Sequence, residues 1–240
     1  MKLIFIRHGD PDYEHDRLTE RGKKEAELLA LRAEELRGDY YFVSPLGRAR
    51  ETAAPLLEKA GAEAVRMDWL REFEGRCIRP DLDREHICWD WMPDDMAAEP
   101  EFLDRIHWTE TGAFAGTNVK AQYDWVISGF DALLEEHGYK RDGTIYRAVR
   151  PNHDTLVFFC HFGVTCVMLS RLMNVSPMVL WHSTATAPTS VTTVFTEERR
   201  EGIASFRMNC LGDTAHLRDA GLEPSFSARF CECFTDDTRH

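Results

Sequence analysis

The sequence of 240 residues contains no long apolar stretch. Its amino terminus carries only Lys2 as an early basic residue and lacks the apolar core of a signal peptide or a membrane span, so we expect a cytoplasmic protein. The seven cysteines are an odd number and are scattered along the chain. This usage predicts reduced thiols rather than a disulfide framework.

Positive charge is also scarce, with 29 Lys and Arg residues against 41 Asp and Glu and a formal net charge of −12. Such a balance opposes binding to nucleic acid or to an anionic membrane, and we predict neither as a partner. It leaves room for a phosphorylated substrate, because a local arginine cluster can reverse the potential inside a pocket. The Cys231/Cys233 and His86/Cys88 pairs lack the ligand spacing of zinc sites, so we predict no metal and no cofactor.

Three short apolar runs each end in a polar turn, and a predicted helix follows. Runs of this kind, rich in β-branched and aromatic residues, are typical of buried strands. Open α/β sheets bind ligands at the carboxyl ends of their parallel strands, so the three turns can converge on one crevice. They begin at Arg7-His8-Gly9, Ser44 and His161-Phe162-Gly163.

The composition, with 43% hydrophobic and 29% charged residues, is typical of an ordered α/β domain of this length. We predict a three-layer α/β/α sandwich with a mostly parallel central sheet and a helical or loop insertion. Residues 1–240 are expected to form one domain, in which an insertion at about 73–150 is a substrate cap. The predicted helices span residues 19–36, 47–60, 117–137 and 164–174.

The residue types at the turns indicate phosphoryl chemistry. The guanidinium of Arg7 offers a fork of donors that matches phosphate, and the imidazole of His8 can attack phosphorus. Gly9 allows a sharp turn and a close approach by a ligand.

Four motifs in this order and with this spacing resemble those of the histidine phosphatase superfamily, which has the phosphoglycerate-mutase-like fold. The resemblance covers roughly residues 1–75 and 155–215, and the middle of the chain matches nothing in it. The motifs are Arg7-His8-Gly9, Leu18-Thr19-Glu20-Arg21-Gly22, Ser44-Pro45-Leu46-Gly47-Arg48-Ala49-Arg50-Glu51-Thr52 and His161-Phe162-Gly163.

The resemblance implies roles for individual side chains. We predict that His8 is the nucleophile and becomes a phosphohistidine, while its other ring nitrogen donates to a carbonyl, for which Gly9 is the candidate. Arg7 and Arg48 are expected to clamp the phosphoryl oxygens. His161 is expected to stabilise charge on the phosphoryl group during transfer.

The proton donor is predicted to be Glu72, which sits where the family places its acid, and Glu74 is close enough to compete. Phe162 stands where many family members have glycine, so we expect it to narrow the pocket and its amide to assist His161. The stretch Asp10-Pro11-Asp12-Tyr13-Glu14 replaces a phosphate-binding asparagine of the family and adds negative charge at the rim.

These features predict a metal-independent phosphomonoesterase that hydrolyses a small phosphorylated metabolite through a phosphohistidine. One alternative is a phosphoglycerate mutase, which shares the first half-reaction but must hold a bisphosphate that the acidic rim disfavours. Another is a non-catalytic protein that binds phosphorylated ligands, although a binder needs neither a nucleophile nor an acid. The sequence identifies neither the physiological substrate nor the oligomeric state.

Overall fold

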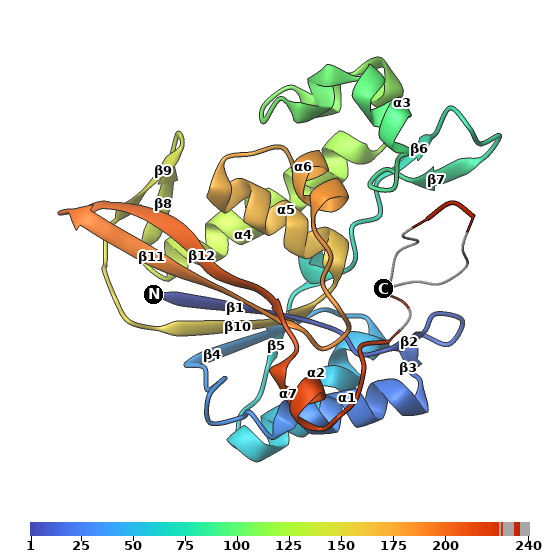
Figure 1. Cartoon of the computed structure of the whole chain (residues 1–240). Helices are drawn as coiled ribbons and strands as arrows, with labels where there is room; N and C mark the ends of the chain where they lie inside the picture. The colour runs from blue at the N-terminus through green and yellow to red at the C-terminus, as the bar shows by residue number, and fades with distance from the viewer. Residues whose placement is uncertain (226, 228–232, 236–240) are drawn as a thin grey trace.

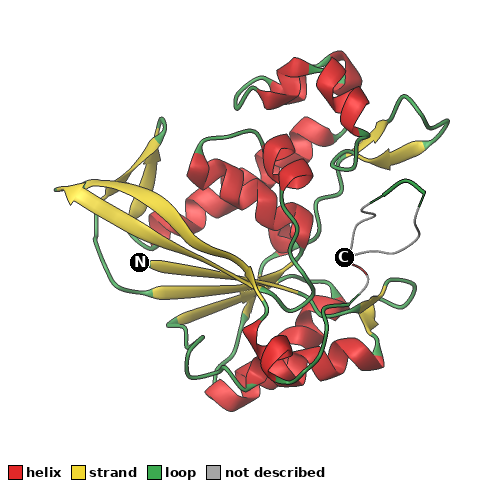
Figure 2. Ribbon diagram, viewed as in Figure 1, coloured by secondary structure: helices red, strands yellow, loops and turns green. Residues whose placement is uncertain are grey.

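The computed structural model describes residues 1–225, 227 and 233–235. At its centre lies an eight-stranded sheet with the strand order β5-β4-β10-β1-β11-β12-β9-β8 and with helices on both faces (Figures 1 and 2). One half is parallel and the other antiparallel. The parallel strands are β5 (Val65–Arg66), β4 (Tyr40–Val43), β10 (Thr155–Cys160) and β1 (Lys2–Arg7), and the antiparallel strands are β11 (Val191–Arg200), β12 (Ile203–Asp213), β9 (Ile145–Ala148) and β8 (Tyr139–Asp142).

The α/β class with flanking helices is confirmed, but the expectation of a mostly parallel sheet is wrong in its detail. Strands β8 and β9, and likewise β11 and β12, are joined by short turns that contain Gly143 and Gly202 at φ 59° and 71°. Such turns reverse the chain directly, whereas a parallel pair requires a crossover of a dozen residues or more. The sheet is therefore mixed.

The helices cover the sheet in two groups (Figure 1). One face carries α1 (Glu20–Ala30), α2 (Gly47–Ala60) and α7 (Ala215–Asp219), and the other carries α4 (Val119–Glu136), α5 (Phe162–Met173) and α6 (Pro177–Ser183). Each group of helices encloses a hydrophobic core against the sheet, and strand β1 contributes to both because its side chains alternate between the two faces. Ile4 and Ile6 pack into the core beneath α1 and α2, and Leu3 and Phe5 pack into the core beneath α4 and α5.

Three phenylalanines form a stacked row across the parallel strands. The ring centroid of Phe158 on β10 lies 5.1 Å from that of Phe5 on β1 and 5.3 Å from that of Phe42 on β4. The three residues are also directly paired in the sheet register. Because the register is fixed, the ends of these strands lie side by side.

Only part of the expected insertion lies outside the sandwich. Helix α4 packs against α5, and β8 and β9 extend the sheet. The part from 76 to 114 lies beyond α5 and α6 in Figure 1. Its aromatic residues, among which Phe102 packs against Trp91 and Phe114, continue the core on this face of the sheet. Its elements are β6 (Arg76–Ile78), β7 (Glu85–Ile87), α3 (Pro93–Ala98), η2 (Pro100–Leu103), η3 (Trp108–Glu110) and η4 (Gly112–Phe114).

Two smaller features complete the architecture. The loop after β1 contains a two-stranded ladder of β2 (Pro11–Asp12) and β3 (Arg17–Leu18), and the short helix η1 (Asp68–Leu70) follows β5. Within the described residues, no helix combines the length and the apolar character that crossing a membrane demands.

Candidate active site

Three polar side chains follow directly on three neighbouring parallel strands. His8 comes after β1, His161 after β10 and Ser44 after β4, and the backbone ladder continues into the site. The N–H of His8 donates to the carbonyl of Cys160 over 3.0 Å, and that of Ser44 donates to Phe159 over 2.9 Å. The rings of His8 and His161 are buried, with 5.0 Å between their centroids and 57° between their planes.

The hydrogen bonding of His8 defines its tautomer. Its Nδ1 lies 2.7 Å from the carbonyl oxygen of Gly9, which can only accept, so Nδ1 carries the hydrogen and Nε2 keeps its lone pair. Burial, and then the charge of Arg7, hold the pKa of His8 well below its ordinary value. His8 is therefore neutral near pH 7, with Nε2 available as a base or nucleophile.

The turn after His8 requires glycine for steric reasons. A Cβ on Gly9 would lie 2.8 Å from the backbone oxygen of Gly22 in α1. The N–H of Gly9 donates to Oγ1 of Thr52 over 2.9 Å, and that hydroxyl donates to the carbonyl of Arg48 over 2.7 Å. These contacts attach the His8 turn to α1 and α2.

His161 is hydrogen-bonded at its other ring nitrogen. Its Nε2 lies 2.7 Å from Oγ of Ser44, and this hydroxyl also accepts the N–H of Leu46 over 3.2 Å. When the hydroxyl of Ser44 donates to Nε2, the ring carries its hydrogen on Nδ1. Nδ1 is buried and has no hydrogen-bond partner. Burial first, and then the proximity of His8 and of nearby arginines, hold the pKa of His161 well below its ordinary value, so the ring is neutral.

Two arginines present further free donors. Nη1 of Arg7 donates to the carbonyl of Thr186 over 2.5 Å, and Nη1 of Arg48 lies 2.6 Å from Oδ1 of Asp16. The Nε atom of each arginine is buried and has no hydrogen-bond partner. Buried donors without partners are rare in proteins, and charged donors bind phosphate strongly. Free guanidinium donors beside two imidazoles are suited to binding an anion.

Tyr13 and Asp16 contact Arg48, although no motif in the sequence points to a specific role for either. The ring centroid of Tyr13 lies 5.3 Å from the guanidinium carbon of Arg48 and 6.4 Å from the ring of His8. Asp16 adopts a left-handed backbone with φ 47° and accepts the N–H of Gly47 over 2.6 Å. Both positions depend on the fold of the loop between β1 and α1, for which the sequence offers no periodic signal.

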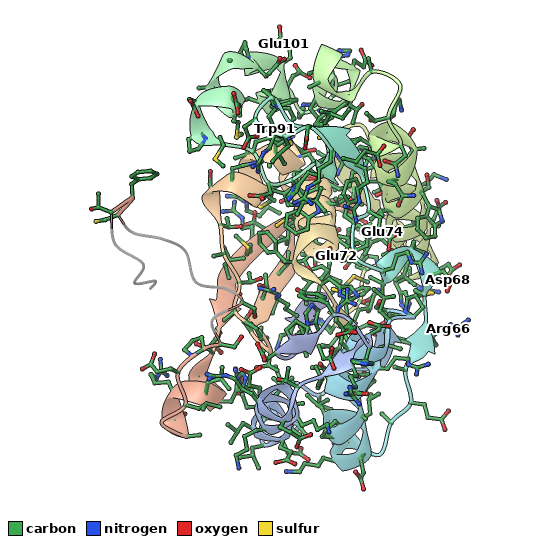
Figure 3. All side chains as sticks on the ribbon, turned by 90° about the vertical axis from the view of Figure 1, so that its right-hand side faces the viewer. Arg66, Asp68, Glu72, Glu74, Trp91 and Glu101 are labelled. Carbon is green, nitrogen blue, oxygen red and sulfur yellow. The ribbon has the colours of Figure 1, made fainter. Side chains whose placement is uncertain are left out.

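The two candidate acids, Glu72 and Glu74, are labelled in Figure 3 and have different surroundings. Oε1 of Glu72 accepts the N–H of Phe73 over 2.8 Å and that of Val164, at the start of α5, over 3.0 Å. Burial raises the pKa of Glu72, although these hydrogen bonds oppose the increase. Glu74 is exposed. Only Glu72 thus contacts the helix that begins directly after His161.

The start of α5 is closely packed around this carboxyl group. A Cβ on Gly163 would lie 2.6 Å from Oε1 of Glu72 and 3.2 Å from Nε1 of Trp89. The half-buried ring of Phe162 meets that of Trp89 edge-on, with 6.0 Å between centroids. Trp89 follows β7, so the segment from 76 to 114 reaches the site through this aromatic contact.

A third loop supports the end of β1. The N–H of Thr189 lies 3.1 Å from the carbonyl of Arg7 and 3.2 Å from that of His8. Oγ1 of Thr189 in turn lies 2.9 Å from Nε2 of His216, which burial and the charge of Arg32 hold at a pKa of about 4. Neutral His216 therefore contacts the site indirectly, through the residue that binds the carbonyls of Arg7 and His8. No motif or spacing in the sequence points to Thr189.

Other charged groups lie apart from this cluster. Arg50 is exposed on α2. Arg79 in the segment from 76 to 114 is buried but forms ion pairs with Asp81 and Asp90. Across the described residues, no set of three His, Cys, Asp or Glu side chains is grouped to hold a metal ion. Cys231 and Glu232 lie outside the described residues.

Two neutral imidazoles beside unsatisfied guanidiniums, at the carboxyl ends of parallel strands, define an α/β enzyme that acts on phosphate groups. Residues 3–209 match the histidine phosphatase superfamily (branch 1). The chain therefore belongs to this superfamily and is a phosphatase of the histidine phosphatase type.

Individual proteins are similar to this chain in sequence or in fold. The chain is 26% identical over 224 residues to phosphoserine phosphatase 1 of Hydrogenobacter thermophilus, with 88% of this chain and 93% of the relative covered. A phosphoserine phosphatase mutant of Entamoeba histolytica, solved with phosphoserine, has the same fold, with a TM-score of 0.56 at 20% identity, covering 90% of this chain and 98% of the other. A mycobacterial glucosyl-3-phosphoglycerate phosphatase, solved with VO3, also gives a TM-score of 0.56 at 20% identity, covering 89% and 99%.

Proposed function

We propose that this phosphatase hydrolyses a small phosphorylated metabolite through a phosphohistidine on His8, without the help of a metal ion. The pairing of His8 with His161 is the observation that carries the proposal. Each buried ring is hydrogen-bonded at one nitrogen. His8 then offers a lone pair at Nε2, and His161 offers a hydrogen at Nδ1 when Ser44 donates to its Nε2. Attack on phosphorus and stabilisation of the charge that develops there require these two functions.

In the first step, Nε2 of His8 attacks phosphorus as the bond between phosphorus and the ester oxygen breaks. Arg7, Arg48 and Nδ1–H of His161 bind the non-bridging oxygens and balance their charge. Glu72, whose pKa burial raises, gives its proton to the leaving oxygen. The alcohol then departs as a neutral molecule.

In the second step, the carboxylate of Glu72 takes a proton from a water molecule that attacks the phosphohistidine. The bond between phosphorus and Nε2 breaks, inorganic phosphate forms, and His8 returns to its neutral state. Glu72 is protonated again and the cycle closes. One carboxyl group thus serves as acid and then as base.

Hydrolysis is favoured over mutase chemistry by the negative charge around the site. Asp10 directly follows Gly9, and the carboxylate of Asp16 is paired with Arg48. A mutase must retain a bisphosphate, and these carboxylates oppose a second phosphate. The relatives described above are phosphatases, and two of them are named for phosphoserine, so phosphoserine is the first metabolite to assay.

The proposal is tested with p-nitrophenyl phosphate. We expect turnover that survives EDTA, that disappears in His8→Ala and that persists in His153→Ala, a control at an exposed histidine before β10. Acid-labile label on the protein after a brief exposure to radioactive substrate would report the phosphohistidine. Loss of activity with EDTA together with retained activity in His8→Ala would overturn this mechanism. Conversion of 3- to 2-phosphoglycerate, stimulated by the bisphosphate, would support the mutase instead.

A further inference from the structure

Arg71, which directly precedes Glu72, has an unusual environment. Its Nε atom is buried and has no hydrogen-bond partner. Among the arginines of the described residues that are not exposed, Arg71 alone makes neither an ion pair nor a side-chain hydrogen bond. The chain carries 41 acidic residues, yet no carboxylate in the described part lies within 4 Å of this guanidinium.

Other arginines show how this protein stabilises a guanidinium that has a structural role. Arg79 pairs with Asp81 over 2.6 Å, and Arg171 pairs with Asp131 over 2.6 Å. Arg141 is half-buried without a carboxylate partner, but it donates to the carbonyls of Gly143 and Arg171. A buried donor without any partner is rare in proteins. The half-buried Arg71 has no protein partner for its buried Nε, which indicates that a ligand fills this place.

The location of Arg71 indicates which ligand. Seven buried side-chain nitrogen or oxygen atoms of the described residues have no hydrogen-bond partner, and four of them are Nε of Arg7, Nε of Arg48, Nε of Arg71 and Nδ1 of His161. Arg71 directly precedes Glu72, whose Oε1 accepts the N–H of Val164 at the start of the helix that follows His161. Burial first, and then nearby charges that include the one on Arg71, lower the pKa of His161, in agreement with this location. Four of these seven atoms in the described part of the chain are therefore His161 Nδ1 itself and nitrogens of the three arginines near it.

We propose that Arg71 is a third arginine of the phosphoryl-binding site and donates to an oxygen of the bound phosphate group. The inference rests on the proposed function, because it uses the same pocket. It extends that function from a clamp of two guanidiniums to a clamp of three. A third guanidinium also gives the pocket of an acidic protein enough positive charge to hold a dianion without a metal ion.

The test compares Arg71→Gln and Arg71→Lys with Arg66→Gln in the full chain. Arg66 is a matched control because it lies five residues upstream, is exposed and projects at the outer edge in Figure 3. Calorimetry measures the affinity for orthovanadate and for inorganic phosphate, and kcat and KM are measured with p-nitrophenyl phosphate. Losing a charge-assisted hydrogen bond should weaken vanadate binding about 10- to 100-fold in Arg71→Gln. Arg71→Lys should recover part of this loss, and Arg66→Gln should bind as the wild type does.

The unfolding midpoint separates ligand binding from a structural role. Removing an uncompensated cation should leave the midpoint of Arg71→Gln unchanged or raise it. A lower midpoint combined with vanadate affinity within twofold of the wild type, a limit of about 0.4 kcal/mol, would contradict the proposal.

A crystal structure of the wild type with vanadate tests the same contact even if the variants fail to fold. We expect a guanidinium nitrogen of Arg71 at about 3 Å from a vanadate oxygen. A guanidinium that points away from the anion would overturn the inference. Anion binding through Arg71 without any phosphoester turnover would contradict only the proposed function, whereas turnover unaffected in Arg71→Gln would contradict only this inference.

Discussion

Asp16 holds Arg48 and the first residue of α2 with a single carboxylate. Its Oδ1 lies 2.6 Å from Nη1 of Arg48, and its Oδ2 lies 2.6 Å from the backbone nitrogen of Gly47. The left-handed backbone of Asp16, with φ 47°, makes this double contact possible. The ion pair fixes one nitrogen of the guanidinium and leaves Nε free. Orientation of Arg48 thus depends on an anion that also offsets part of its charge.

Substituting Asp16 should therefore impair catalysis, because Asp16 orients Arg48. In Asp16→Ala, Arg48 loses its anchor, and we expect kcat/KM for p-nitrophenyl phosphate to fall about 10- to 100-fold. Asp12→Ala is the control, since Asp12 lies in the same loop but pairs with Arg17 and His15. Equal activities of the two variants would show that the Asp16 contact has no catalytic consequence.

The tautomer of His161 can be tested at Ser44. Ser44→Ala removes the hydroxyl from Nε2, so the hydrogen of the ring is no longer directed to Nδ1. We expect kcat to fall roughly tenfold, the scale of one hydrogen bond to a reacting group. Ser170→Ala removes a comparable buried hydroxyl, one that bonds the carbonyl of Val167 within α5, and should leave kcat unchanged. A similar kcat in both serine variants would assign Ser44 a packing role only.

The role of Glu72 is tested by comparing leaving groups. Glu72→Gln cannot protonate a departing alkoxide, so its kcat should fall by about 100-fold or more with phosphoserine and much less with p-nitrophenyl phosphate, whose leaving group needs no proton. Glu74→Gln is the matched control at the exposed neighbour.

The pH profile follows from the same two groups. Burial raises the pKa of Glu72, so the protonated acid is lost as pH rises through that elevated value. The pKa of His8 is lowered, so its lone pair is lost only as pH falls through that depressed value. Glu72→Gln should therefore abolish the alkaline decline with phosphoserine and retain the acidic one. An alkaline decline that persists would assign the acid to another residue.

His216 links the stability of the fold to pH. Its pKa is about 4 in the folded protein and about 6.5 in an unfolded chain. The folded state thus favours the neutral ring, and the resulting stability is present above about pH 6.5 and is lost as pH falls toward 4. Urea titrations at several pH values should show that His216→Gln loses less stability over this range than the wild type, by no more than about 3 kcal/mol. Parallel pH dependences would show that His216 does not contribute.

Much of the fold was predictable because the apolar runs in the sequence coincide with the buried strands that precede the site residues. Helix α2 occupies the residues predicted for it, 47–60. Helix α1 ends at Ala30, earlier than predicted, because Ala33 and Leu36 are buried in turns rather than in a helix. The spacing of these apolar residues in the sequence indicates that they are buried. It does not show whether they lie in a helix or in turns. Strands β8 and β9 were missed because their polar sequences follow no clear alternation.

The candidate site divides in a similar way. His8 and His161 could be paired from the sequence because both follow strands, and parallel strands end at one edge of the sheet. Asp16, Thr189 and Arg71 could not, because each depends on the path of a loop. The loop positions are set by contacts such as the one from Thr189 to the carbonyl of His8, which forms only in the folded chain.

The row of Phe5, Phe158 and Phe42 runs through the same three strands that deliver His8, His161 and Ser44. Trimming one of these rings would leave a void in the interior and would also let one strand slide against its neighbour. Heat resistance and turnover are therefore expected to decline together at these positions, and a variant selected only for tighter packing there would change the reacting geometry as well.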